Sequence, residues 1–373
     1  MNWGTPPWTI DFAAEAHALP AAADFAVVGG GFSGLAAAAW LRRIAPEQSV
    51  VLLEASKIGS GASGRTGGLA LAESAAGPLD GQGDVLAGYR EILSSLEAGV
   101  DLELPGVYEI AHKGGHLDSP IVWEDTGTLR VIREVPGGGI DAGRVVGGLA
   151  RAACRLGALV FENTRVEAIE FGSPIVLRTG SGTLRSRGLL LATNAQSADL
   201  SGLAEDSRAK FTLAVLTEPL AAEAMAAVGL GSGKAFYTAD LPYLWGRPMP
   251  DRAVIFGSGL VDIGDDEDLA ALDIETGVAA GMFAGLEQRV RGLHPALANV
   301  RFARRWGGPI RFGSSWQLFF DRHPRSADTI VLNGLGGDGV TLSVYLGRWA
   351  AEALAGRRAM PAWGKIPRRP TSG

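Results

Sequence analysis

The sequence is poor in cysteine and histidine, the residues that form redox pairs and many metal sites. It has one cysteine, Cys154, which excludes an internal disulfide, a thiolate cluster and a CxxC redox pair. The five histidines show no HExxH or similarly close spacing, so we predict no metal site. Lys and Arg number 34 against 40 Asp and Glu, and the formal charge of −6 gives no electrostatic reason to expect a nucleic-acid partner.

A long uninterrupted hydrophobic run is also missing. The longest apolar stretch, residues 25–41, contains four glycines and a serine and follows the acidic Asp24. This pattern argues against a signal peptide and against a membrane span, so we expect a cytoplasmic protein. The 373 residues are 47% hydrophobic, which is enough for one large core or for two domains that share an interface.

A strand, a turn, a helix and a second strand follow one another near the N-terminus. We predict strands at residues 24–28 and 49–54 and a helix at residues 35–44. Such a unit of about 30 residues has the size of a parallel βαβ crossover. The turn between the first strand and the helix consists of Gly29, Gly30, Gly31, Phe32, Ser33 and Gly34.

This turn fits the dinucleotide-binding pattern GxGxxG. Gly29 would make the tight turn, Gly31 would let a pyrophosphate approach the backbone, and Gly34 would allow the helix to pack closely on the strand. Glu54 ends the second strand, where its carboxylate can accept hydrogen bonds from ribose hydroxyls. An acidic residue at this position argues against the 2′-phosphate of NADP. The pattern does not distinguish FAD from NAD, and an incidental glycine-rich turn is the alternative.

Elements further along the chain divide between two kinds of composition. Residues 141–157 predict an amphipathic helix, and strands are predicted at 158–162, 165–171, 188–193 and 329–332, with a glycine turn at 333–339 and a helix at 340–354. Residues 206–323 are richer in aromatics and predict strands at 211–217, 243–247 and 253–257 and a helix near 275–290. We therefore predict a discontinuous first domain (1–75, 141–205 and 324–373) and a second domain (76–140 and 206–323).

Two glycine-rich segments carry a resemblance to a known family. Residues 59–68 read Gly-Ser-Gly-Ala-Ser-Gly-Arg-Thr-Gly-Gly, and residues 334–343 read Gly-Leu-Gly-Gly-Asp-Gly-Val-Thr-Leu-Ser. They resemble the flavin-contacting loop and the C-terminal flavin-binding turn of the D-amino-acid oxidase-type family of FAD-dependent oxidoreductases, which includes glycine, sarcosine and γ-glutamylputrescine oxidases. Thr66 stands where that family usually has Asn. The resemblance implies an α/β plus α+β fold, with a Rossmann-type FAD-binding domain and a second, mixed-sheet substrate domain.

The resemblance also implies which residues contact FAD. Besides the turn residues and Glu54, they are Ala55, Ser63, Arg65, Thr66, Gly67, Gly68, Val166, Thr193, Asn194, Gly336, Gly337, Asp338, Gly339, Val340 and Thr341. The helix that starts near residue 339 would face the N1–C2=O edge of the flavin and stabilise the negative charge of its reduced form. Covalent members of the family attach flavin through a cysteine in the C-terminal half. The one cysteine of this chain, Cys154, lies instead in the helix predicted at residues 141–157, so we predict non-covalent FAD here.

The substrate side has weaker signals. Tyr243, Trp245 and Arg247 alternate, so on a strand they would share one face as an aromatic wall with a cation for a substrate carboxylate. Ordinary sheet packing with a surface arginine explains the same pattern equally well. Trp306 lies in a segment that resembles one near the family's active site, and Arg65 would add positive potential at the flavin.

These features lead to a hypothesis for the reaction. An amine or amino acid would transfer hydride from its α-carbon to flavin N5, the imine would hydrolyse, and O2 would reoxidise the flavin. The alternatives are a dehydrogenase that passes electrons to a protein or quinone acceptor, and a non-catalytic flavin-binding subunit of a complex.

Overall fold

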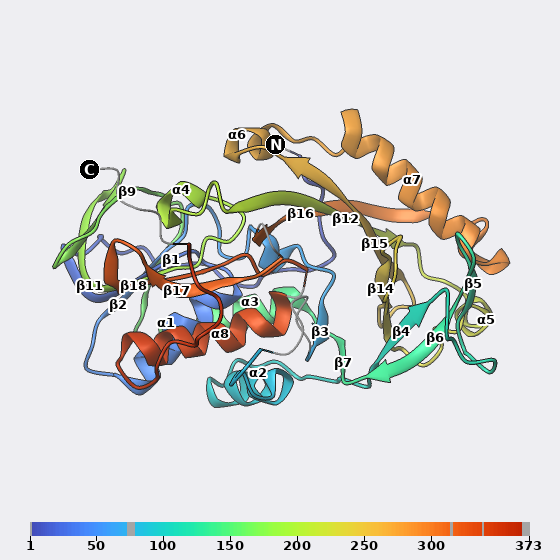
Figure 1. Cartoon of the computed structure of the whole chain (residues 1–373), viewed down its shortest axis with the longest axis horizontal. Helices are drawn as coiled ribbons and strands as arrows, with labels where there is room; N and C mark the ends of the chain where they lie inside the picture. The colour runs from blue at the N-terminus through green and yellow to red at the C-terminus, as the bar shows by residue number, and fades with distance from the viewer. Residues whose placement is uncertain (1, 73–78, 314–315, 338, 368–373) are drawn as a thin grey trace.

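The computed structural model describes residues 2–72, 79–313, 316–337 and 339–367. Two eight-stranded sheets organise the molecule, one in each half of the view in Figure 1. Their arrangement confirms the predicted α/β domain with a second, mixed-sheet part. Within the described residues, no helix is both long and apolar enough to cross a membrane.

The first sheet has the order β17-β18-β11-β1-β2-β8, with β9 and β10 attached beside β11. Its strands are β1 (Ala22–Val28), β2 (Val50–Leu53), β8 (Leu159–Phe161), β9 (Val166–Glu170), β10 (Ile175–Thr179), β11 (Gly182–Leu191), β17 (Phe319–His323) and β18 (Ser326–Asn333). The neighbours from β18 to β8 are parallel. All four residues of β2 are buried, as expected for a central parallel strand covered on both faces.

A layer of helices covers one face of this sheet. It contains α1 (Phe32–Ile44), α2 (Val85–Ser95), α3 (Ala142–Arg155) and α8 (Gly339–Leu354), and α1 lies between α3 and α8 (Figure 1). Close packing explains the small residues of α1: a side chain at Gly347 of α8 would place its Cβ 2.4 Å from the carbonyl oxygen of Ser33. The helix begins three residues earlier than predicted, because the second half of the glycine turn already has helical geometry.

The second sheet has the order β16-β12-β15-β14-β13-β4-β6-β5. Its strands are β4 (Val107–Ala111), β5 (Val122–Glu124), β6 (Thr128–Val135), β12 (Ser207–Thr217), β13 (Ala235–Thr238), β14 (Trp245–Pro248), β15 (Val254–Ile263) and β16 (Phe302–Gly313). Only the β13–β4 pair is parallel among these neighbours. Trp123, Phe236 and Phe256 form an aromatic cluster in its core, and α7 (Gly277–Leu293) packs against β15 and β12.

Shorter elements complete the chain: α4 (Ala198–Ser201), α5 (Ala222–Ala227), α6 (Asp266–Ala271), the 3₁₀ turns η1 (Ala62–Gly64) and η2 (Pro295–Leu297), and a two-stranded ribbon of β3 (Leu69–Leu71) and β7 (Gly137–Gly139). Further details differ from the predictions. The helix α2, which the predicted boundaries assign to the second domain, packs against α8 over the first sheet. The strand predicted at 243–247 begins at Trp245, and β17, which the predicted boundary at residue 324 assigns to the second domain, pairs with β18 in the first sheet.

Candidate cofactor and substrate site

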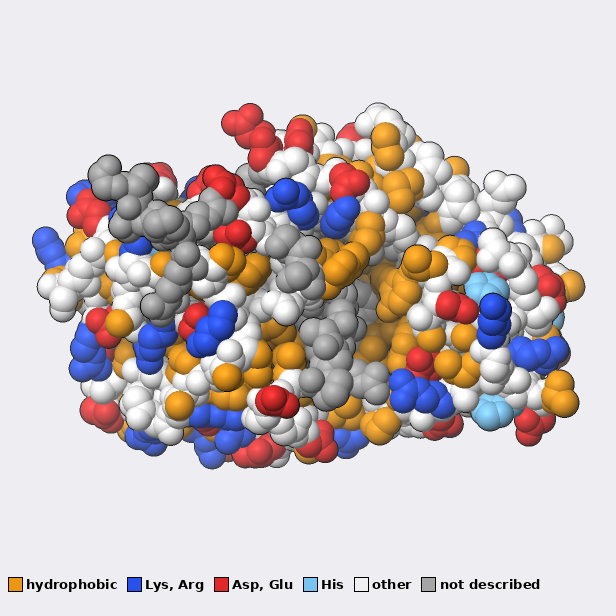
Figure 2. Space-filling model, viewed as in Figure 1, with side chains coloured by type: hydrophobic (Ala, Val, Ile, Leu, Met, Phe, Trp, Pro, Cys, Tyr) orange, Lys and Arg blue, Asp and Glu red, His pale blue; other side chains and the backbone are white. Residues whose placement is uncertain are grey.

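A cavity of about 690 Å³ lies where the two sheets meet. The molecule is visibly hollowed near its middle, with hydrophobic side chains around the hollow (Figure 2). The lining comes from the glycine turn after β1, the loop after β2, the end of β11, the face of the second sheet and the start of α8. Residues that are far apart in the sequence therefore share one site.

The glycine turn has the geometry predicted for it. Gly29 has φ +111°, and a Cβ there would lie 2.5 Å from the carbonyl oxygen of Ala192 on the neighbouring strand end. A Cβ at Gly34 would lie 1.9 Å from the carbonyl oxygen of Gly29, so close helix–strand packing needs glycine. The N-cap, Gly31, offers no capping side chain, and within the first turn of α1 the Phe32 N–H donates to Ser63 Oγ at 2.9 Å. The remaining positive end of the helix lines the cavity, where it could bind an anion.

Glu54 holds the turn from the side of β2. Its Oε2 accepts from the Gly30 N–H at 2.7 Å and its Oε1 accepts from the Ser56 N–H at 2.9 Å. Burial raises the pKa of the Glu54 carboxyl, and these two N–H donors oppose the rise. The side chain lines the cavity, so its remaining acceptor capacity faces the space where a ribose would lie.

Two residues after β11 bring buried side-chain oxygen atoms to the cavity. The Thr193 Oγ1 and Asn194 Oδ1 atoms are buried and have no hydrogen-bond partner among the described residues. Buried polar atoms are costly when unsatisfied, so such atoms point to a ligand that bonds them. Val166 lines the same end of the cavity. Together with the glycine turn and Glu54, these groups fit a dinucleotide such as FAD.

The loop after β2 is fixed in place largely by Arg65. Its guanidinium donates to the carbonyl oxygens of Gly307 and Trp3, each at 2.6 Å, and to that of Gly4. Trp306 is fully buried and donates from Nε1 to the carbonyl oxygen of Arg65 at 3.0 Å. Burial lowers the pKa of Arg65 to about 10. Both side chains line the cavity, but these bonds make them a clamp between the loop, β16 and the N-terminal segment.

Most of the predicted cofactor contacts line the cavity. They are Gly29, Gly31, Phe32, Ser33, Glu54, Ala55, Ser63, Arg65, Thr66, Gly67, Val166, Thr193, Asn194, Gly336, Gly337, Gly339 and Val340. Asp338 lies outside the described residues.

Three predicted contacts are absent from the lining. Gly34 and Gly68 pack against backbone, with a Cβ at Gly68 falling 2.5 Å from the carbonyl oxygen of Ile140. The Thr341 hydroxyl donates to the carbonyl oxygen of Leu71 and ties α8 to β3.

The substrate prediction is met only in part. Tyr243 and Trp245 line the cavity, but Arg247 does not. Arg247 is 7% exposed, its guanidinium lies 5.1 Å from the centre of the Trp8 ring, and it donates to Met249 Sδ at 3.2 Å. Burial lowers its pKa to about 10. Arg247 therefore does not face the cavity as expected, because Trp8 and β7 cover that part of the strand.

Sequence reasoning also missed residues of the second sheet that line the cavity, among them Glu109 on β4 and Tyr237 on β13. No motif marks them. The one available signal was an acidic residue inside the otherwise apolar stretch Val-Tyr-Glu-Ile-Ala at residues 107–111.

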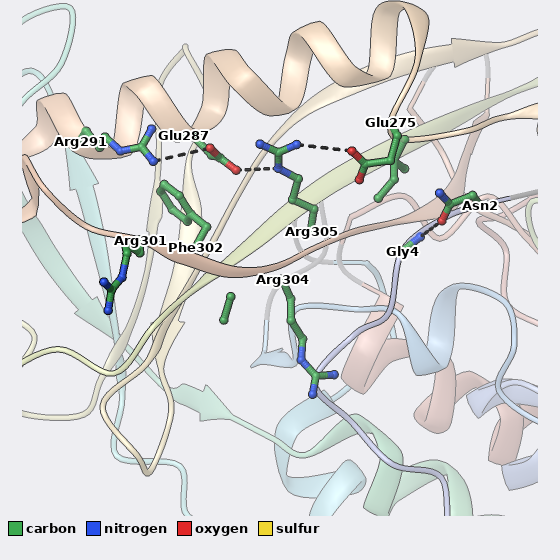
Figure 3. Close-up of a pocket in the computed structure, with 11 residues that line it drawn as sticks. Asn2, Gly4, Glu275, Glu287, Arg291, Arg301, Phe302, Arg304 and Arg305 are labelled. Carbon is green, nitrogen blue, oxygen red and sulfur yellow. Dashed lines mark hydrogen bonds and ion pairs between the residues drawn. The ribbon is translucent and has the colours of Figure 1, made fainter.

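A second, shallower pocket of about 440 Å³ lies between α7, β16 and the N-terminal segment (Figure 3). Its charged groups alternate in sign: Glu287 pairs with Arg305 at 2.6 Å and with Arg291 at 3.7 Å, and Arg305 also pairs with Glu275 at 3.7 Å. The two other cations of the lining also have protein partners, since Arg301 pairs with Glu218 and Arg304 donates to the carbonyl oxygen of Pro6 at 3.0 Å, so we assign no ligand to this pocket.

Comparisons with known proteins agree with the geometry of the large cavity. Residues 24–353 match the family model described as FAD dependent oxidoreductase. The chain is 27% identical to the gamma-glutamylputrescine oxidoreductase of Escherichia coli (strain K12), over 94% of this chain and 88% of that protein. It is 26% identical to a probable oxidoreductase, OrdL, of Rhizobium meliloti (strain 1021), over 90% of this chain and 83% of that one.

Solved structures show the same fold at lower identity. The glycine oxidase of Geobacillus kaustophilus superposes with a TM-score of 0.71 and 19% identity, covering 92% of this chain and 97% of that chain. The L-proline dehydrogenase of P. horikoshii gives 0.70 and 17%, covering 91% and 95%. The family match spans nearly all of both sheets, so the resemblance inferred from the two glycine-rich segments is confirmed. The chain belongs to the family of FAD-dependent oxidoreductases.

Proposed function

We propose that this protein binds FAD non-covalently in the large cavity and oxidises a C–N bond of an amine or amino acid to an imine, which hydrolyses in water. One observation carries the proposal: the dinucleotide-type turn and an aromatic wall from the second sheet line the same cavity. A cofactor held by the turn and a small molecule held against the wall would therefore meet.

The residues that would hold the ADP half of FAD lie on the first sheet. The N–H groups at the start of α1 would bind the pyrophosphate, Glu54 the ribose hydroxyls, and the backbone at Val166 the adenine. Gly67 and the turn residues Gly336, Gly337, Gly339 and Val340 would lie along the flavin. Cys154 lies on α3, outside the cavity lining, which supports non-covalent binding.

When bound, FAD supplies a hydride acceptor at flavin N5 and later passes the electrons to O2 or another acceptor. The work left to the protein is to orient the amine and keep water away. Trp245 and Tyr243 supply an apolar wall for this purpose, and Trp306 with Arg65 keeps the loop that faces the wall in position.

The choice of amine or amino acid rests on similarity. Relatives of this fold are named for action on γ-glutamylputrescine, glycine and L-proline, each a compound with an oxidisable C–N bond. These names include both an oxidase and a dehydrogenase, so a dehydrogenase with a protein or quinone acceptor is the second candidate. A non-catalytic flavin-binding subunit is the third.

Two experiments test the proposal. Acid precipitation of the yellow protein should release flavin into the supernatant, and colour retained in the pellet would contradict non-covalent binding. Anaerobic mixing with a panel of amines and amino acids should bleach the flavin absorbance, whereas a structural subunit would show no reduction by any of them. Readmission of air then separates an oxidase, which recovers its colour at once, from a dehydrogenase that needs another acceptor.

A further inference from the structure

A single row of side chains crosses the second sheet beneath the cavity. Directly paired residues on neighbouring strands point to the same face of a sheet. The pairings are Trp306 with Ala214, Ala214 with Gly257, Gly257 with Trp245, Trp245 with Tyr237, Tyr237 with Glu109 and Glu109 with Arg133. All of the row up to Glu109, except Gly257, lines the cavity.

The part of the row that lines the cavity passes the glycine-rich loop after β2 at Trp245 and ends at the acidic Glu109. The Trp245 ring touches that loop, since a Cβ at Gly67 would lie 1.9 Å from its Cζ3. Glu109 lies two strands further along, which corresponds to roughly 10 Å at the usual strand spacing. A molecule lying along the row from Trp245 would therefore bring its far end to the Glu109 carboxylate.

The second sheet contributes one charged side chain to the cavity lining of the described residues, and it is Glu109. Of the other charged lining residues, Glu54 and Arg165 belong to the ADP end and Arg65 is bonded to three backbone carbonyls. Arg247 lies outside the lining. A substrate carboxylate at this sheet would thus find an anion where the sequence had suggested a cation.

Glu109 is itself partly neutralised from the side away from the cavity. Its Oε2 accepts from Nε of Arg133, the next residue in the row. The Glu109 side chain is 10% exposed, whereas that of Arg133 is 53% exposed and lies outside the cavity lining. Water screens the arginine more than the glutamate, so the cavity experiences a net negative potential at this end.

We propose that Glu109 determines specificity by binding a positively charged group of the substrate, remote from the amine that is oxidised. This inference rests on the proposed function and narrows its substrate class to amines with a second cationic group, as in a terminal diamine. Tyr237 and Trp245 would pack along the apolar chain between the two ends.

Three probes of equal length test the proposal in the FAD-loaded protein: 1,6-diaminohexane, hexylamine and 6-aminohexanoate, whose far ends are cationic, neutral and anionic. Anaerobic stopped-flow measurement of flavin reduction should rank their efficiencies in that order. A Glu109→Gln substitution keeps an acceptor for Arg133 and should lower the ratio of diamine to hexylamine efficiency by about tenfold or more, the typical effect of losing a charged hydrogen-bond partner.

Two further variants keep the test decisive. Glu170→Gln, in the exposed pair of Glu170 with Arg178 on β9 and β10, is the matched control and should leave the ratio unchanged. Arg133→Gln removes the competing cation and should raise the ratio, which provides a test even if Glu109→Gln does not fold. Equal efficiencies for the three probes, or a preference for 6-aminohexanoate or an α-amino acid, would overturn the inference but leave amine or amino-acid oxidation intact. Failure of every amine and amino acid to reduce the flavin would refute both.

Discussion

Replacing Glu54 with Gln should weaken FAD binding by about 10- to 150-fold. In the wild type, both carboxylate oxygens accept backbone N–H bonds, from Gly30 at 2.7 Å and from Ser56 at 2.9 Å, while the side chain lines the cavity. A glutamine amide has one oxygen, so its NH2 group would face one of these donors. Losing a hydrogen bond to a charged group costs about 1.5–3 kcal/mol, and this free energy corresponds to the expected 10- to 150-fold increase in the dissociation constant.

Titration of apoprotein with FAD, followed by quenching of flavin fluorescence, measures the dissociation constant. Glu162→Gln is a control in the same region, because the Glu162 side chain is 8% exposed and accepts from the Ile58 N–H at 2.8 Å but does not line the cavity. It should disturb the neighbouring loop without removing a ribose acceptor. If the two variants weaken FAD binding equally, Glu54 serves only the loop and its assignment to the ribose fails.

The pH dependence of FAD binding gives an independent check on the same residue. Burial raises the pKa of Glu54, so protonation removes its charge at a higher pH than for an ordinary glutamate. The ionised form is the acceptor. Affinity should therefore be full above this pKa and fall as the pH drops through it, and the Glu54→Gln variant should lack that step. Parallel pH profiles for variant and wild type would contradict the assignment.

Two other perturbations have expected outcomes. Arg65→Ala removes three hydrogen bonds to backbone carbonyls and should lower the free energy of unfolding in denaturant titrations by at least about 1.5–3 kcal/mol, the cost of one hydrogen bond to a charged group. The flavin midpoint potential should also fall if Arg65 stabilises reduced flavin, and an unchanged potential would restrict its role to the clamp. Burial, aided by Arg325, lowers the pKa of His323 to about 4 from an ordinary 6.5. The unfolded chain then binds the extra proton, so thermal stability should fall as pH drops from 6.5 towards 4. His323→Gln should flatten that slope, and an unaltered slope would assign it to other groups.

The cofactor side of the site could be predicted because its signals are local. Gly29, Gly31 and Glu54 lie within one βαβ unit, where the spacing of the turn and the length of the crossover decide what meets the helix start. Thr341 was expected to contact FAD on the same grounds, but it does not line the cavity. Its position in the first turn of α8 was predicted correctly, but the rotation of that helix directs its hydroxyl to Leu71 on β3, and this depends on tertiary packing.

The substrate side could not be predicted in the same way, because its register is non-local. Alternation correctly suggested that Trp245 and Arg247 share a face of one strand, but it carries no information about what covers that face. Trp8, from a segment without any motif, covers Arg247. Glu109 reaches the cavity through the parallel pairing of β4 with β13, which joins residues more than a hundred positions apart.

The contact between the two sheets explains why two glycines are needed at the centre of the site. The Trp245 ring lies between the loop after β2 and the neighbouring strand β15, and a Cβ would come within 1.9 Å of it at Gly67 and within 2.0 Å at Gly257. Packing against Trp245 thus requires glycine at position 67, apart from any contact with flavin. Because the ring fills the space of both missing side chains, it fixes the distance between the cofactor loop and the substrate wall. The position of Trp245 therefore sets the distance from the cofactor loop to Glu109. We expect the cavity to select its substrate by the length of the molecule and by the charge at its far end.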